Sequence, residues 1–181
     1  MLKKPNAKKR GLVKRAFELE RGMLQIAKKP RRFPVYDDEP YVTFTVYGVP
    51  SPQGSLRAMP LGAKAGGRAI IVQGGTKESR ERLLSWRDSC GAAARAALAG
   101  QPALAVACAV VVAFYLPRPK SAPKSVIYPA KKPDLDKLVR SLMDALSQVA
   151  FIDDALVVDV MACKRFAIDR EPGADVELYA L

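Results

Sequence analysis

The segment at residues 132–138, Lys-Pro-Asp-Leu-Asp-Lys-Leu, contains two carboxylates that could hold a metal ion together. Asp134 and Asp136 are two positions apart, so inside a continuous helix they would point in very different directions. They can converge if Asp134 is an N-cap with an extended backbone and Asp136 lies in the first turn. Pro133 favours this arrangement, because proline disfavours a helical conformation in the residue before it. We therefore expect a shared metal position at the start of a helix.

A second acidic pair, Asp153 and Asp154, lies between the helix expected over residues 135–149 and a strand expected over residues 156–166. The connection could fold this pair towards Asp134 or away from it, and the sequence leaves both arrangements open. In the first case three or four carboxylates would meet, and they need a cation because like charges repel. Mg²⁺ could then activate water and stabilise charge on a phosphate, assisted by basic side chains. Three basic residues stand close by in the sequence: Lys132, Lys137 and Arg140.

Purely structural roles are the alternative for the same carboxylates. Asp134 could serve only as an N-cap. Asp136, Arg140 and Asp144 have the i, i+4, i+8 spacing of an exposed row of ion pairs. The later acidic pair could be turn residues. Spacing alone does not separate these roles from a metal site.

The composition excludes several kinds of chemistry. The sequence contains no histidine, which removes Ser-His-Asp and Cys-His catalysis as well as histidine ligands. Cys90, Cys108 and Cys163 are widely spaced in apolar settings, which indicates buried thiols in a reducing cytoplasm. An oxygen-only site favours Mg²⁺ or Mn²⁺.

The longest apolar run, residues 103–116, is shorter than the ~20 residues of a membrane helix, so we expect a cytoplasmic protein without membrane contact.

The formal net charge is +12, and it is concentrated at the N-terminus. Residues 1–32 hold 12 Lys or Arg against two Glu, a net charge of +10, whereas the other 149 residues hold 18 against 16, a net charge of +2. We expect a basic arm and linker over residues 1–40 and a folded domain over residues 41–181. The arm could be a solvated tail or could bind phosphates.

The remaining pattern predicts alternating strands and helices. Strands are expected over residues 42–47, 69–73, 103–116, 156–166 and 174–181, and helices over residues 77–98 and 135–149. Thr76 is an expected N-cap for the first helix. The run at residues 103–116 is apolar throughout, so we expect a central strand covered on both faces. Residues 55–68 and 117–132 are expected to be basic loops.

The ordered pattern Pro133-Asp-Leu-Asp-Lys-Leu138, then Met143-Asp-Ala-Leu146, then Asp153-Asp154 resembles the RusA family of Holliday-junction resolvases, most closely its phage-type members. Weaker resemblance extends to Pro50–Gly54 and Lys164-Arg165. The resemblance implies an α+β fold with a mixed, mainly antiparallel sheet packed with two main helices. It also implies a homodimeric endonuclease that resolves four-way DNA junctions by paired symmetric nicks in recombination and repair. Mg²⁺ or Mn²⁺ would be the cofactor, and the host-cell cytoplasm the location if a phage encodes the protein.

The resemblance also implies roles for individual residues. The catalytic and metal-binding carboxylates of the family fall on Asp134, Asp136 and Asp154, with Asp153 as the reserve choice. The catalytic lysine of the family falls on Arg140, which is a departure, because arginine keeps the charge but not the geometry. Lys137 is the alternative, and both assignments stay open.

The two basic loops become candidate DNA-contact surfaces, although ordinary solvated charge would explain any single residue equally well. The expected phosphate contacts are Arg57, Arg118, Lys120, Lys124, Lys131 and Lys132. Two other functions would use the same sequence features. One is a metal nuclease for other branched DNA, and the other is a non-catalytic nucleic-acid-binding protein that uses the basic arm.

Overall fold

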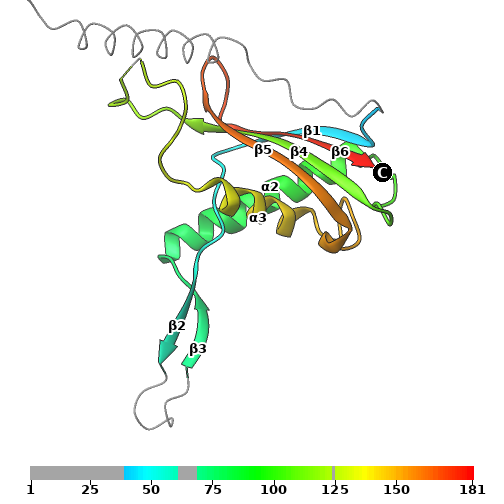
Figure 1. The fold of residues 1–181 in the computed structure, drawn as a ribbon, viewed down its shortest axis with the longest axis horizontal. Coiled ribbons are helices and arrows are strands. Elements are labelled where there is room, and N and C mark those ends of the chain that lie inside the picture. The colour runs from blue at the N-terminus through cyan, green and yellow to red at the C-terminus, as the bar shows by residue number, and fades with distance from the viewer. Residues whose placement is uncertain (1–38, 61–68, 124) are drawn as a thin grey trace, which may run out of the picture. The chain divides into compact units, whose positions relative to one another are not determined.

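The computed structural model describes residues 39–60, 69–123 and 125–181, all within the compact unit Tyr36–Leu181. The order of elements along the chain is β1 (Val42–Tyr47), β2 (Leu56–Pro60), β3 (Ala69–Gln73), α2 (Lys77–Leu98), β4 (Cys108–Pro117), α3 (Leu135–Leu146), the short 3-10 helix η2 (Asp154–Leu156), β5 (Val157–Ala167) and β6 (Gly173–Ala180) (Figure 1). The expected arm at residues 1–40 lies almost wholly outside the described residues, and its boundary with the domain stays a prediction.

Four strands form one sheet in the order β1-β6-β4-β5, and β2 and β3 form a separate antiparallel pair. β6 pairs antiparallel with both β1 and β4, whereas β5 pairs parallel with β4. The predicted α+β fold with a mixed, mainly antiparallel sheet is therefore confirmed. β4 is central, as its apolar composition predicted, and Ala109 and Val110, which point to opposite faces, are both completely buried.

Both long helices pack on one face of the sheet. Alternate residues of β4, among them Val110, Val112 and Phe114, point into the same core as the apolar side of each helix. From α3, Leu138, Leu142 and Leu146 are completely buried, as expected for apolar residues that recur every three or four positions along one side of a helix. Helices α2 and α3 also contact each other, and Arg87 of α2 pairs with Asp144 in the second half of α3.

The ends of α2 agree with the sequence. Thr76 is its N-cap, with the hydroxyl accepting a hydrogen bond of 3.2 Å from the Ser79 amide, and Ala99 closes the helix in the left-handed conformation. Leu83 and Trp86 of α2 are buried in the core, whereas Leu84 is 58% exposed. None of the helices in the described part of the chain has the length and apolar character needed to cross a membrane.

Three predicted boundaries are wrong. The strand expected from residue 103 begins at Cys108, because Leu104 instead makes an isolated bridge with Phe151. The helix expected to reach residue 149 ends at Leu146, where the chain turns so that the Gln148 amide donates to the Phe151 carbonyl. The loop expected over residues 55–68 contains strand β2, which pairs with β3; residues 61–68 lie outside the described residues.

Candidate active site at the start of helix α3

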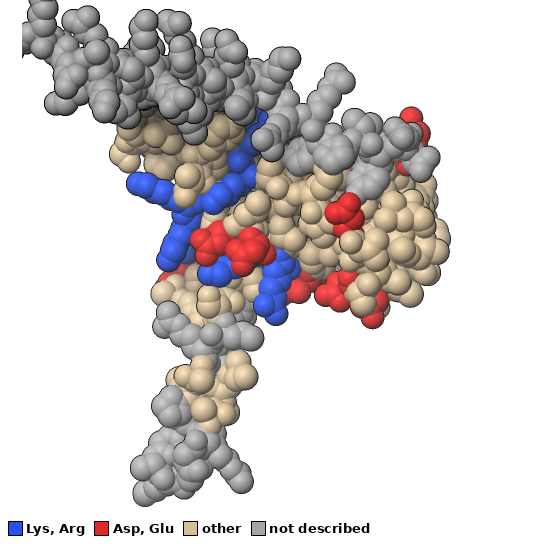
Figure 2. Space-filling view, in the orientation of Figure 1, with Lys and Arg blue, Asp and Glu red and all other residues tan. Residues whose placement is uncertain are grey.

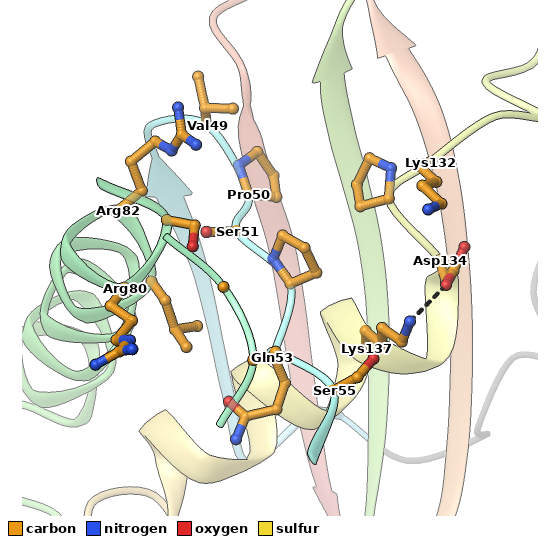
Figure 3. Close-up of a pocket in the computed structure, with 17 residues that line it drawn as sticks. Val49, Pro50, Ser51, Gln53, Ser55, Arg80, Arg82, Lys132, Asp134 and Lys137 are labelled. Atoms are coloured by element: carbon orange, nitrogen blue, oxygen red, sulfur yellow. Dashed lines mark hydrogen bonds and ion pairs between the residues drawn. The ribbon is translucent and has the colours of Figure 1, made fainter. Parts of the chain in front are cut away.

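Asp134 is the N-cap of α3, with the extended backbone that the sequence predicted (φ −71°, ψ 140°), and Asp136 lies in the first turn. The Asp134 carboxylate does not cap the helix, however. It accepts a hydrogen bond of 2.8 Å from the Lys137 ammonium, one turn further along (Figure 3). The carboxylate thus points away from the free backbone N–H groups and is available to a ligand from solvent.

Positive charge gathers around Asp134. The hydrogen bond from Lys137 lowers the pKa of Asp134 most, and the charges of Lys137, Lys132 and Lys164 lower it further. The pKa of Lys137 is raised, first by its hydrogen bond to Asp134 and also by the charge of Asp136. Both carboxylates therefore stabilise the positive charge of the Lys137 ammonium. The side chains of Lys137 and Asp134 are 36% and 44% exposed, so solvent screens this ion pair substantially.

Lys164 is a site residue that the acidic motif by itself does not predict. It lies on β5 opposite Phe114 of β4, and its ammonium donates to the backbone carbonyls of Lys131 (2.9 Å) and Pro133 (2.8 Å). It therefore ties the segment directly before Asp134 to the sheet. Lys164 is two residues after Ala162, which packs against the core, so the alternation of the strand places it on the same inward side. A lysine at such a position is unusual, since lysine is rarely buried without partners. That alternation is the signal that could have found it.

A cavity of about 560 Å³ opens beside Asp134 and Lys137. The loop at residues 49–55 forms one wall, and the starts of α2 and α3 form the others (Figure 3). Hydrogen bonds hold the loop in place, because the Gln53 amide donates to the Lys137 carbonyl (2.9 Å) and the Gly74 amide donates to the Ser55 carbonyl (2.7 Å). Four cations contribute to the lining: Arg80, Arg82, Lys132 and Lys137.

The later acidic pair lies beyond the opposite end of α3 (Figure 1). The helix has 12 residues, which corresponds to a length of about 18 Å. Asp153 accepts a hydrogen bond of 2.9 Å from the Ala155 amide and so caps η2, as its turn role predicted, and Asp154 is exposed. Among the described residues, no three Asp, Glu or Cys side chains lie close enough to hold a metal ion. A cluster of three or four carboxylates is therefore not formed within the described part of one chain.

The expected row of ion pairs along α3 is also not formed. Asp144 pairs with Arg87 of α2, and the same guanidinium donates to the Gln53 side chain. Arg87 thus joins both helices to the loop that lines the cavity. Within the described residues, no ion pair within 4.0 Å connects Asp136 with Arg140. The Asp136 carboxylate is exposed and is free to bind a ligand.

The candidate DNA-contact residues fall into different settings. Arg57 belongs to strand β2 rather than to a loop. Arg118 lies 5.2 Å from the centre of the Phe166 ring and donates to the Pro123 carbonyl (2.6 Å), so it also stabilises its own loop. Lys120, Lys131 and Lys132 are exposed, and Lys124 lies outside the described residues. Figure 2 shows acidic side chains bordered by Lys and Arg on the face that carries α3.

The fold and the site together define a class of protein: an α+β domain that presents a carboxylate pair among basic side chains at one helix start, as enzymes acting on phosphate esters do. The RusA family, described as endodeoxyribonuclease RusA, matches residues 62–179. The chain therefore belongs to this family, and the predicted resemblance is confirmed.

A curated relative, the uncharacterized protein YqaN of Bacillus subtilis (strain 168), is 35% identical over 75 residues, which cover 36% of this chain and 51% of the relative. The chain thus spans about half the length of this relative.

Proposed function

We propose that the protein is a divalent-metal-dependent endodeoxyribonuclease that resolves four-way DNA junctions as a homodimer, by paired symmetric nicks. The observation that carries the proposal is the pair Asp134 and Asp136 at the start of α3, with the Lys137 ammonium 2.8 Å from Asp134. In a chain of the RusA family, this pair is the natural position for the reaction centre.

The residues present fit Mg²⁺ or Mn²⁺. Both ligands are carboxylates, which suit these hard cations, and Mg²⁺ is often held by one or two carboxylates with waters and substrate phosphates in the remaining positions. Asp134 and Asp136 would hold the ion. When bound, it supplies Lewis-acid activation of a water and stabilisation of charge on the phosphate.

Lys137 is the better candidate for the catalytic cation. Its ammonium donates to Asp134 and interacts electrostatically with Asp136, and from there it can donate to a non-bridging oxygen of a bound phosphate. Arg140 is exposed and lies one turn beyond Asp136. We assign to Arg140 a contact with the DNA backbone, since arginine binds phosphates well through its planar group.

Asp154 requires a different explanation. The length of α3, about 18 Å, separates it from Asp134 within one chain. We propose that the Asp154 carboxylate, with Asp153 beside it, acts at the carboxylate pair of a second subunit. Two chains would then complete two equivalent sites, as paired nicking requires. Mixing Asp134→Asn protein with Asp154→Asn protein should restore one complete site per dimer, and hence single nicks.

The decisive experiment uses a synthetic four-way junction with the full-length chain and Mg²⁺ or Mn²⁺. Wild-type protein should make two symmetric nicks, and Asp134→Asn should bind the junction without cutting it. Asp88→Asn is the matched control, because Asp88 is an exposed carboxylate on α2. If the wild-type protein binds the junction but does not cleave it with either metal, the proposed nuclease activity is refuted. If linear duplex is cut equally well, or forks and flaps are cut preferentially, the assignment of four-way junctions as the substrate is wrong.

A further inference from the structure

A second cavity, of about 430 Å³, adjoins the one beside Asp134. Both cavities are lined by Val49 and Arg82, so they share a wall. We name the two cavities together, from Asp134 through Arg82 to Tyr47, the strand channel. We propose that the strand channel binds two or three unpaired nucleotides of the DNA strand next to the cleaved phosphate. This inference rests on the proposed function, because it places the strand at the Asp134 site.

The walls of the strand channel suit a single strand rather than a duplex. In the first cavity the prolines Pro50 and Pro52 and the buried side chain of Leu83 supply apolar surface. In the second cavity Tyr47 is 68% exposed although it belongs to a sheet strand. Exposed aromatic rings are the surfaces on which unpaired bases stack. Each cavity also has a volume within the about 300–1,000 Å³ range of small-molecule sites.

Arginines along the strand channel can bind a phosphate backbone, and Glu81, the acidic residue that lines the second cavity, is paired with Lys77. Arg80 and Arg82 stand on the α2 side of the first cavity (Figure 3). In the described part of the chain, neither guanidinium makes an ion pair within 4.0 Å. Both are therefore available to a ligand. Cations beside apolar and aromatic surface form the combination by which proteins bind single strands.

An unsatisfied donor marks the same region. Trp86 lines the second cavity and is 3% exposed, and its indole N–H has no hydrogen-bond partner within the described residues. Buried donors normally have partners. The loop at residues 49–55 is anchored before any ligand arrives, through Gln53 and Ser55, so the channel is preformed.

The first test measures binding of a short oligothymidine to full-length protein without divalent metal, by fluorescence anisotropy over a range of salt concentrations. Tyr47→Ala should weaken binding at least about fivefold, and Tyr47→Phe should not, because the ring provides the stacking. Arg82→Ala should weaken binding and reduce the salt slope by about 0.7, the value for one phosphate contact to a single strand. Arg95→Ala is the matched control, an exposed arginine in the last turn of α2. Equal affinities for Tyr47→Ala, Arg82→Ala and the wild type would overturn the proposal.

The second test locates the strand directly. A four-way junction that carries 5-iodouracil next to the cleavage position is irradiated with full-length Asp134→Asn protein, and the crosslinked peptide is identified by mass spectrometry. Crosslinks should fall on Tyr47, and crosslinks confined to residues 1–38 would refute the channel. Neither test requires cleavage. A protein that binds through the strand channel but cuts no junction would therefore refute the proposed function alone.

Discussion

Replacing Lys164 by methionine tests whether the sheet positions the carboxylate pair. The change keeps an unbranched, mostly apolar side chain but removes the ammonium that donates to the carbonyls of Lys131 and Pro133. Hydrogen bonds that involve a charged group contribute about 1.5–3 kcal/mol each. One of these two is exposed and the other part-buried, so we expect a loss of only about 1–3 kcal/mol for both in the free energy of unfolding.

The effect on catalysis should be larger than the effect on folding. Without Lys164, the segment before Asp134 is no longer tied to β5. The Asp134 carboxylate can then shift from its position. A displacement of about 1 Å can cost about 100-fold in rate. We expect kcat for junction cleavage to fall roughly 10- to 100-fold and the metal concentration for half-maximal activity to rise, while junction affinity stays unchanged.

The assay titrates Mg²⁺ and Mn²⁺ against cleavage at fixed junction concentration, and urea melts measure the folded fraction. Lys164→Arg should recover part of the activity because it keeps donors near the two carbonyls. Lys77→Met, at an exposed position on α2, is the matched control. An unchanged metal requirement combined with a lower folded fraction would show that Lys164 serves stability only, and the positioning argument would be wrong.

Three further predictions concern the rest of the molecule. The pKa of Asp175 is lowered chiefly by its hydrogen bond from Arg170 and also by Thr45. Since the folded pKa lies below the unfolded value of about 3.9, the pair stabilises the fold above that pH, and the stability is lost as pH falls through the folded pKa. Urea melts below about pH 4 should thus depend less on pH in Asp175→Asn; an identical pH dependence would contradict this. Leu142→Ala, at a completely buried position, should lower the free energy of unfolding by about 2–5 kcal/mol, and a loss under about 1 kcal/mol would be inconsistent with that packing. Deleting residues 1–38 should weaken DNA affinity and its salt dependence while metal-dependent cutting persists, and unchanged affinity would show that the arm does not bind DNA.

Local patterns in the sequence were sufficient for most elements. The alternation of apolar residues in β1 and the 3–4 spacing of Leu138, Leu142 and Leu146 report directly on which side of an element is buried. Thr76 and Asp134 were found as N-caps for the same reason, because capping depends on the residue type at one position. Boundaries were missed where a distant partner decides them, as when Phe151 bridges to Leu104 outside the sheet.

The carboxylate pair at the start of α3 is a property of the sequence itself. Pro133, the N-cap position of Asp134 and the first-turn position of Asp136 are neighbours in the chain, so local sequence alone places both aspartates at the start of the helix. The surroundings of the pair depend on pairings between distant segments. Lys164 reaches it because β5 pairs parallel to β4, and the cavity exists because the loop at residues 49–55 is bonded to α3. The later acidic pair lies beyond the other end of the helix because α3 is 12 residues long, a length that the spacing of aspartates along the chain does not reveal.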